Sequence, residues 1–159
     1  MLVPSDYKEL LKILNKHRVR CLIVGAYAVA YHAEPRYSKD IDIWVEPEEG
    51  NAKKVYAALK EFGAPLRGIK IGDFANKTLV YQIGVAPVRV DIIMGIPGIT
   101  FKQAWEHRAR TRFEGVMANI LGIKELIKAK EKARRTIDAI DLENLQQRLK
   151  LRTKSIKIQ

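Results

Sequence analysis

The sequence predicts a single α+β domain in which a mixed β-sheet is flanked by helices and followed by a C-terminal helical segment. Apolar strand-like runs alternate with amphipathic helical runs along the 159 residues. The chain contains no internal repeat and no linker rich in Pro, Gly or Ser. We therefore expect a core over about residues 1–100, a helical part over about 101–150 and a basic tail over 151–159.

The first half of the chain predicts two helix–strand pairs. Asp6 and Glu9 form a capping-box pattern that opens an amphipathic helix. A buried strand over 20–25 and a short alanine-rich helix over 26–32 follow, and the second strand spans 38–46. We then expect a helix over 48–62 capped by Gly63. The pattern returns to strands from Ile69 to Met94, with strands over 78–85 and 88–94 joined by a tight turn at Ala86–Pro87. The last expected elements are a helix over 101–110, a short strand within 113–121 and a helix over 123–150 with a break near Arg135–Thr136.

Positive charge is concentrated in the last third of the chain. The net charge is +11, and the segment from Lys102 onward carries 15 Lys and Arg against 7 Asp and Glu, which leaves +8 there. Such an excess favours polyanions, meaning RNA, DNA or nucleotide phosphates. A solvated basic helix surface would give the same composition, so charge biases the choice of partner and does not settle it.

Composition argues against a membrane or secreted protein. No run of about 18 apolar residues is present, so no transmembrane helix is expected. The first residues lack a basic stretch followed by an apolar one, and the single Cys21 can form no internal disulfide. We expect a cytoplasmic protein.

Two carboxylates are predicted on one face of the second strand. Side chains alternate between faces along a strand, so Asp40 and Asp42 point the same way, roughly 7 Å apart, while Ile41 and Ile43 face the core. Like charges placed together repel unless a cation or a proton intervenes. The pair is therefore a candidate metal site, with two surface residues of an edge strand as the alternative.

A third carboxylate, Asp91, interrupts the apolar strand over 88–94. If that strand lies beside the Asp40–Asp42 strand, the three acids converge and could hold two Mg²⁺ ions, or Mn²⁺ ions, roughly 3.5–4 Å apart. Asp91 could also accept the proton of an attacking hydroxyl.

Gly25 stands where the first strand turns into a helix. A glycine there lets the backbone approach a phosphate closely, and the helix that follows presents free N–H groups. Arg36, Ser38 and Lys39 lie between this turn and the aspartates as candidates for phosphate oxygens, although Arg36 and Lys39 would serve equally as solvated turn residues. The arrangement suits attack on the α-phosphate of a nucleoside triphosphate, with pyrophosphate leaving.

Several segments together carry a resemblance to a known family. In chain order they are Gly25–His32, Pro35–Arg36, Lys39–Asp42, Asp91, Leu126–Ile127, Lys130, Arg135, Asp138 and Asp141. Gly-Ala, thirteen residues and then Asp-Ile-Asp resembles the signature of the DNA polymerase beta-like nucleotidyltransferase superfamily. The chain is similar to its minimal prokaryotic members, including relatives encoded in toxin–antitoxin and phage-defence pairs.

The resemblance implies a nucleotidyltransferase-like fold over about residues 8–145 and a Mg²⁺-dependent enzyme. It implies Asp40, Asp42 and Asp91 as metal ligands and catalytic residues, and it directs Lys130 toward the nucleotide, with Gly25 and Ala26 at the triphosphate. Lys130 is also one of many lysines on a basic helix. Asp138 and Asp141 would hold the local structure or the site.

Position 26 departs from the family pattern. Catalytic members place a serine there to bind the triphosphate, whereas Ala26 keeps the backbone N–H and lacks the hydroxyl. Two functions therefore stay open. One is an enzyme that transfers an NMP from an NTP to a hydroxyl of RNA, such as a tRNA 3′ end, or of a protein or small molecule. The other is a degenerate nucleotide-binding or RNA-binding domain that regulates a partner protein.

Other Asp-x-Asp enzymes fit less well. Aspartate-nucleophile phosphatases need a different turn after the pair, and sugar-nucleotide transferases are longer chains. Neither class accounts for the glycine turn upstream of Asp40.

Overall fold

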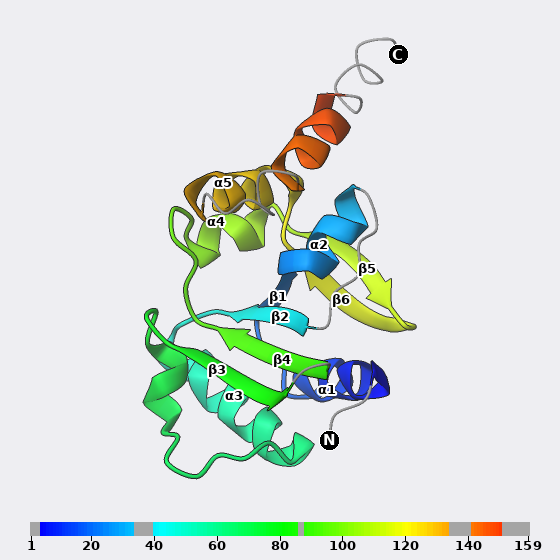
Figure 1. Ribbon diagram of the computed structural model, residues 1–159. Helices are drawn as coiled ribbons and strands as arrows, with labels where there is room; N and C mark the ends of the chain where they lie inside the picture. Colours follow the sequence, from blue (N-terminus) through cyan, green and yellow to red (C-terminus); the bar gives the residue numbers. More distant parts are fainter. Residues whose placement is uncertain (1–3, 34–39, 86–87, 134–140, 151–159) are drawn as a thin grey trace.

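The computed structural model describes residues 4–33, 40–85, 88–133 and 141–150, and Figure 1 shows their arrangement. The strands are β1 (Cys21–Val24), β2 (Asp40–Val45), β3 (Val80–Val85), β4 (Val88–Ile93), β5 (Ala109–Phe113) and β6 (Val116–Ile120). The helices are α1 (Pro4–Lys16), α2 (Gly25–His32), α3 (Glu49–Phe62), α4 (Phe101–Glu106) and α5 (Ile123–Ala133), with a 3₁₀ helix η1 (Ile71–Ala75). Residues 141–150 are helical as well.

Within the described residues the strands form a six-stranded mixed sheet in the order β3-β4-β2-β1-β6-β5. β2 pairs with β4, and β1 with β6, in parallel, while the other neighbours are antiparallel. The predicted α+β class with a mixed sheet flanked by helices is confirmed.

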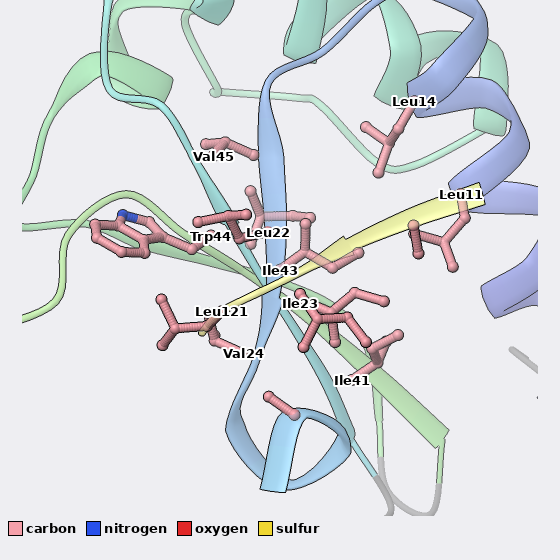
Figure 2. Packing of buried hydrophobic residues seen from close by; sticks show 14 of the residues in the cluster. Leu11, Leu14, Leu22, Ile23, Val24, Ile41, Ile43, Trp44, Val45 and Leu121 are labelled. Carbon is pink, nitrogen blue, oxygen red and sulfur yellow. The ribbon is translucent and has the colours of Figure 1, made fainter. Parts of the chain in front are cut away.

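One face of the sheet is apolar and packs on α1 and α3, which lie together in Figure 1. Ile41, Ile43 and Val45 alternate with the acidic positions of β2, so they point to this side. All three side chains are fully buried, as are Leu10 and Leu14 of α1. Figure 2 shows this packing, with side chains of the neighbouring strands β1 and β2 beside Leu11 and Leu14 of α1. Burial of this many aliphatic side chains holds the two central strands rigidly in place.

The opposite face carries Asp40, Asp42 and Trp44. Trp44 is 1% exposed and packs edge-on against Phe101, with ring centroids 5.1 Å apart. Phe101 in turn stacks on Trp105 of the same helix. These aromatic contacts seat α4 over the Trp44 end of β2, beyond Asp42 along the strand.

Three expectations differ from the structure. The first helix begins at Pro4 rather than at an Asp6 cap, because proline suits the first helical turn and Asp6 then favours the positive end of the helix dipole. Part of the segment expected to form strands after residue 69 is the 3₁₀ helix η1. The predicted helix over 101–110 ends at Glu106, and β5 follows.

The β5–β6 hairpin begins where the sequence predicted the end of the helix over 101–110, and β6 lies within 113–121, where a short strand was expected. Its strands alternate in exposure, and its turn consists of Glu114 and Gly115, both with positive φ. Arg110 and Arg112 take the exposed positions of β5, and the positions between them are only partly buried, so the strand has no strongly apolar face that would reveal it in the sequence. The predicted turn at Ala86–Pro87 and the break near Arg135–Thr136 lie outside the described residues.

None of the helices in the described ranges is long and apolar enough to cross a membrane.

Candidate active site

The parallel pairing of β2 with β4 brings the predicted acids together. In this register Asp42 lies opposite Asp91 and Asp40 lies opposite Arg89. All four side chains share the face on which Trp44 lies, because partners in a register point the same way. Neighbouring strands are about 4.8 Å apart, so the Asp42 and Asp91 carboxylates meet across the strand pair.

Gly25 closes one side of this carboxylate pair. It follows Val24, which is the β1 partner of Asp42, and it opens α2 with a φ of +66°. A Cβ built at position 25 would lie 2.1 Å from Oδ2 of Asp42, closer than atoms can approach. Only glycine fits both the left-handed backbone and this contact. The first N–H groups of α2, which no Val24 side chain caps, are thereby set beside Asp42.

Arg89 binds two of the three acids. Its Nη2 donates to Oδ2 of Asp40 at 2.9 Å and to Oδ2 of Asp91 at 3.2 Å, and its Nε donates to Oδ1 of Asp91 at 3.0 Å. The arginine, which these hydrogen bonds and charges hold with a raised pKa, is 32% exposed along its side chain.

Asp42 is the acid that Arg89 does not contact directly in these hydrogen bonds. Burial raises the pKa of Asp42 to about 7, and the adjacent Asp91 carboxylate, which is also its hydrogen-bond partner, adds to the rise. Asp40 adds a smaller increment, and Arg89 opposes it. At neutral pH the Asp42 carboxyl therefore holds a proton for much of the time, beside the Asp91 carboxylate.

The Asp42–Asp91 pair fits a divalent cation. A bound cation could take the place of the Asp42 proton, and both carboxylates offer oxygen, which is the ligand that Mg²⁺ prefers. Within the described ranges, no group of three acidic, histidine or cysteine side chains is arranged to hold a metal ion. Arg89 Nη2 donates hydrogen bonds to both Asp40 and Asp91 and so occupies the space between these two acids. Asp40 would join the pair only if Arg89 turned aside.

Lys130 lines the same cavity as Gly25 and Asp42. This cavity has a volume of about 180 Å³ and is otherwise mostly apolar. Lys130 reaches it from α5 and lies 3.5 Å from Asp141 Oδ2, with both side chains buried. Asp141 thus pairs with a buried ammonium group on a helix that borders this cavity, because a buried charge needs a partner.

A larger cavity of about 780 Å³ shares Ile96 and Pro97 as lining residues with the first. Trp44 and Phe101 belong to its lining, and its charged residues balance, with Lys77 and Lys102 on one side and two glutamates, Glu46 and Glu48, on the other. Small-molecule sites usually occupy about 300–1,000 Å³. The smaller cavity alone would therefore not contain a nucleotide, whereas the larger one is of the right size for a ligand.

The remaining predicted site residues lie partly inside and partly outside the residues that the structure describes. Ala26 is buried in the first turn of α2. Arg36, Ser38 and Lys39, together with Asp138, lie outside the described residues. Arg89 was missed, although its signal was present: in a strand, Arg-Val-Asp puts the arginine on the same face as the acid two residues later.

Comparison with known proteins identifies similar solved structures but no relative by sequence. No family model matches the sequence, and no curated protein matches it either. Among solved structures, the lincosamide antibiotic adenylyltransferase LnuA with bound lincomycin is similar with a TM-score of 0.58 and 12% identity, over 91% of this chain and 97% of that one.

Two further structures are similar. A Thermotoga maritima protein assigned to the nucleotidyltransferases matches with a TM-score of 0.58 and 16% identity, over 89% of this chain and 93% of that one. The antibiotic-resistance factor ANT(2″)-Ia matches with a TM-score of 0.56 and 11% identity, over 96% and 94% of the respective chains. At such identities the likeness concerns the fold.

We expect Gly25→Ala to disturb the site more than the backbone strain alone would. Gly68→Ala is the matched control, because Gly68 also has a positive φ, +78°, but a Cβ there meets nothing within 4 Å. Both variants should lose about 1 kcal/mol of unfolding free energy from the left-handed backbone. Gly25→Ala should lose at least about 1 kcal/mol more, measured by urea denaturation, because Asp42 must move. Equal losses would contradict the contact.

We expect Asp42→Asn to stabilise the metal-free protein at pH 8 and to have little effect near pH 4. A carboxyl whose pKa rises on folding favours the folded state at low pH, and this stabilisation is lost as the pH rises toward about 7. Asparagine imitates the neutral acid at every pH, so the gain at pH 8 should be on the order of 2 kcal/mol. Denaturation in EDTA at both pH values measures it, and a pH-independent difference would count against the raised pKa.

Proposed function

We propose that this chain, which has the nucleotidyltransferase fold, transfers a nucleoside monophosphate from an NTP to a hydroxyl acceptor with the help of Mg²⁺. The observation that carries the proposal is the Asp42–Asp91 pair held in register against the Gly25 turn. The raised pKa of Asp42, which lines a cavity, supports the choice of this place as a functional site. The arrangement joins a place for phosphate, at the α2 N–H groups, to a place for cations.

In the proposed reaction the acceptor oxygen attacks the α-phosphorus. The new bond forms from the acceptor oxygen to phosphorus, the bond from phosphorus to the β-phosphate oxygen breaks, and pyrophosphate leaves. Asp91 accepts the proton of the acceptor hydroxyl, and the α2 N–H groups hold phosphate oxygens. Bound Mg²⁺, held by Asp42 and Asp91 and by Asp40 once it is free, would neutralise phosphate charge and favour the alkoxide form of the acceptor.

Lys130 is proposed to contact the triphosphate. Its ammonium group lies beside the cavity that Gly25 and Asp42 also line, and Asp141 holds it there. A lysine acts on phosphate as a point charge, so its position matters more than its exact orientation. Arg36, Ser38 and Lys39 are proposed as further phosphate ligands from the segment that precedes β2.

For the acceptor we favour RNA, with a tRNA 3′ end as one candidate. The support is the net charge of +11 and its concentration after residue 102. Arg110 and Arg112 are exposed on β5, where Arg112 also donates a hydrogen bond to the carbonyl oxygen of Gly115, and both add positive charge to the surface. A small hydroxylated molecule or a protein side chain is the competing acceptor, since LnuA is described as acting on a lincosamide. The larger cavity, beside the carboxylates across Ile96 and Pro97, is the proposed place for it.

A second candidate is a non-catalytic domain that binds nucleotide or RNA and regulates a partner protein, as in two-gene toxin–antitoxin systems. Ala26 favours it, because a buried methyl group replaces the serine hydroxyl expected at the triphosphate. Loss of that hydroxyl removes one hydrogen bond to an anion, an interaction worth about 1.5–3 kcal/mol.

We expect the double variant Asp40→Ala/Asp42→Ala to lose at least about a hundredfold in transfer rate, because it removes charge neutralisation and positioning together. The assay follows label from each α-³²P NTP into total RNA, a panel of hydroxylated small molecules or protein. Glu106→Ala/Glu131→Ala is the charge-matched control, since both glutamates are exposed and distant from the acids in sequence. Equal labelling by the double variant and the wild type would refute the assignment.

We expect isothermal titration with Mg²⁺ to show binding of at least one NTP with a Kd below about 1 mM, a value that corresponds to roughly −4 kcal/mol. Ala26→Ser should bind it more tightly than the wild type, because the added hydroxyl gains a phosphate contact. No binding of any NTP by either protein would favour the regulatory domain instead.

A further inference from the structure

Arg89 occupies a position that the proposed chemistry does not require. It precedes Asp91 by two residues in β4 and is the register partner of Asp40 in β2. Asp-Ile-Asp in β2 therefore lies beside Arg-Val-Asp in β4. Together the two strands present three acids and one base on the same face of the sheet. The base lies next to Asp40 and Asp91 and diagonal to Asp42.

The contacts of Arg89 engage most of the oxygens that a cation would need. Both carboxylate oxygens of Asp91 accept hydrogen bonds from it, at 3.0 and 3.2 Å. Oδ2 of Asp40 accepts another at 2.9 Å. One nitrogen, Nη2, serves both acids, so the guanidinium group lies where an ion shared by Asp40 and Asp91 would have to lie.

An arginine at this place cannot be displaced by losing its proton. The guanidinium stays charged at every pH a protein survives, so it leaves only by rotation of the side chain. Mg²⁺ needs oxygen ligands at about 2.0–2.1 Å in near-octahedral geometry. Oxygens already engaged with Arg89 do not meet that demand, and the two cations also repel each other. At 32% exposure, the Arg89 side chain has solvent into which it can turn.

We propose that Arg89 is an internal counter-ion that competes with divalent metal for Asp40 and Asp91. In the protein without substrate it closes the carboxylate site and keeps metal affinity low, and the site opens when the arginine turns away. This inference adds a specificity-determining residue to the proposed function, on which it rests for the identity of the metal site. A purely structural arginine would only stabilise the strand pair.

Binding of Mn²⁺ to the nucleotide-free protein tests this role without any turnover. Free Mn²⁺ gives a sharp electron paramagnetic resonance signal that disappears on binding, so titration at pH 8 yields a Kd. Arg89→Met and Arg89→Gln should each bind Mn²⁺ at least about tenfold more tightly than the wild type, because the charge-assisted hydrogen bonds that compete with the metal are gone. Two substitutions guard against a folding defect in either one.

Three controls define the result. Arg112→Met, on β5, removes one exposed positive charge and should leave the Kd within about twofold, which separates a local effect from net charge. Arg89→Lys keeps the charge but not the fork and should fall between the wild type and Arg89→Met. Asp91→Asn added to Arg89→Met should abolish the tight binding and so place the ion at the carboxylates.

Unchanged or weaker Mn²⁺ binding in both folded Arg89 variants would overturn the proposal. So would tight binding that survives Asp91→Asn. Failure here is distinguishable from failure of the proposed function. If the Arg89 variants bind Mn²⁺ more tightly but no NTP gives transfer of label, the role of Arg89 stands and the proposed transferase activity is refuted. If label is transferred but the Kd for Mn²⁺ is unchanged, the activity stands and the role of Arg89 is refuted.

Discussion

The parallel register between β2 and β4 is the constraint on which the rest of the site depends. A shift by one residue would send Asp91 to the apolar face and Val90 toward Asp42. With the register as it is, two carboxylates face each other in a half-buried place, and the surrounding structure compensates for their repulsion. The raised pKa of Asp42, the hydrogen bonds from Arg89 and the polar start of α2 are all consequences of this repulsion.

Rigid packing on both faces of β2 makes it possible to hold these carboxylates together despite their repulsion. On the far side of the sheet, fully buried Ile41 and Ile43 hold β2 in the core, and on the near side the Trp44–Phe101–Trp105 stack fixes its end. Substitutions that enlarge or empty these positions commonly cost several kcal/mol. The acids therefore sit on a strand that has little freedom to relax their repulsion by moving, and relief must come from protons or cations.

Sequence reasoning went furthest where periodicity and side-chain chemistry agreed. Alternation placed Asp40 and Asp42 on one face, and the mixed α+β class followed from the order of apolar runs. It failed at β5, where arginines occupy exposed strand positions and mask the period. It also passed over Arg89, because a lone base in a strand resembles a solvated side chain until the neighbouring strand is known. Pairing is a long-range property that no local window contains. The roles of Gly25, Lys130 and the acids stay predictions about chemistry, although the structure gathers them.

The buried pair of Lys130 and Asp141 has a mechanical consequence. Asp141 is the first residue of the described helical segment 141–150, whose Leu145 is fully buried, whereas Lys130 borders the cavity that Asp42 lines. Moving this segment outward would separate the buried ammonium group of Lys130 from the Asp141 carboxylate, at a cost on the order of several kcal/mol. A molecule that binds the outer surface of the helix would thus affect the lining of the cavity without entering it.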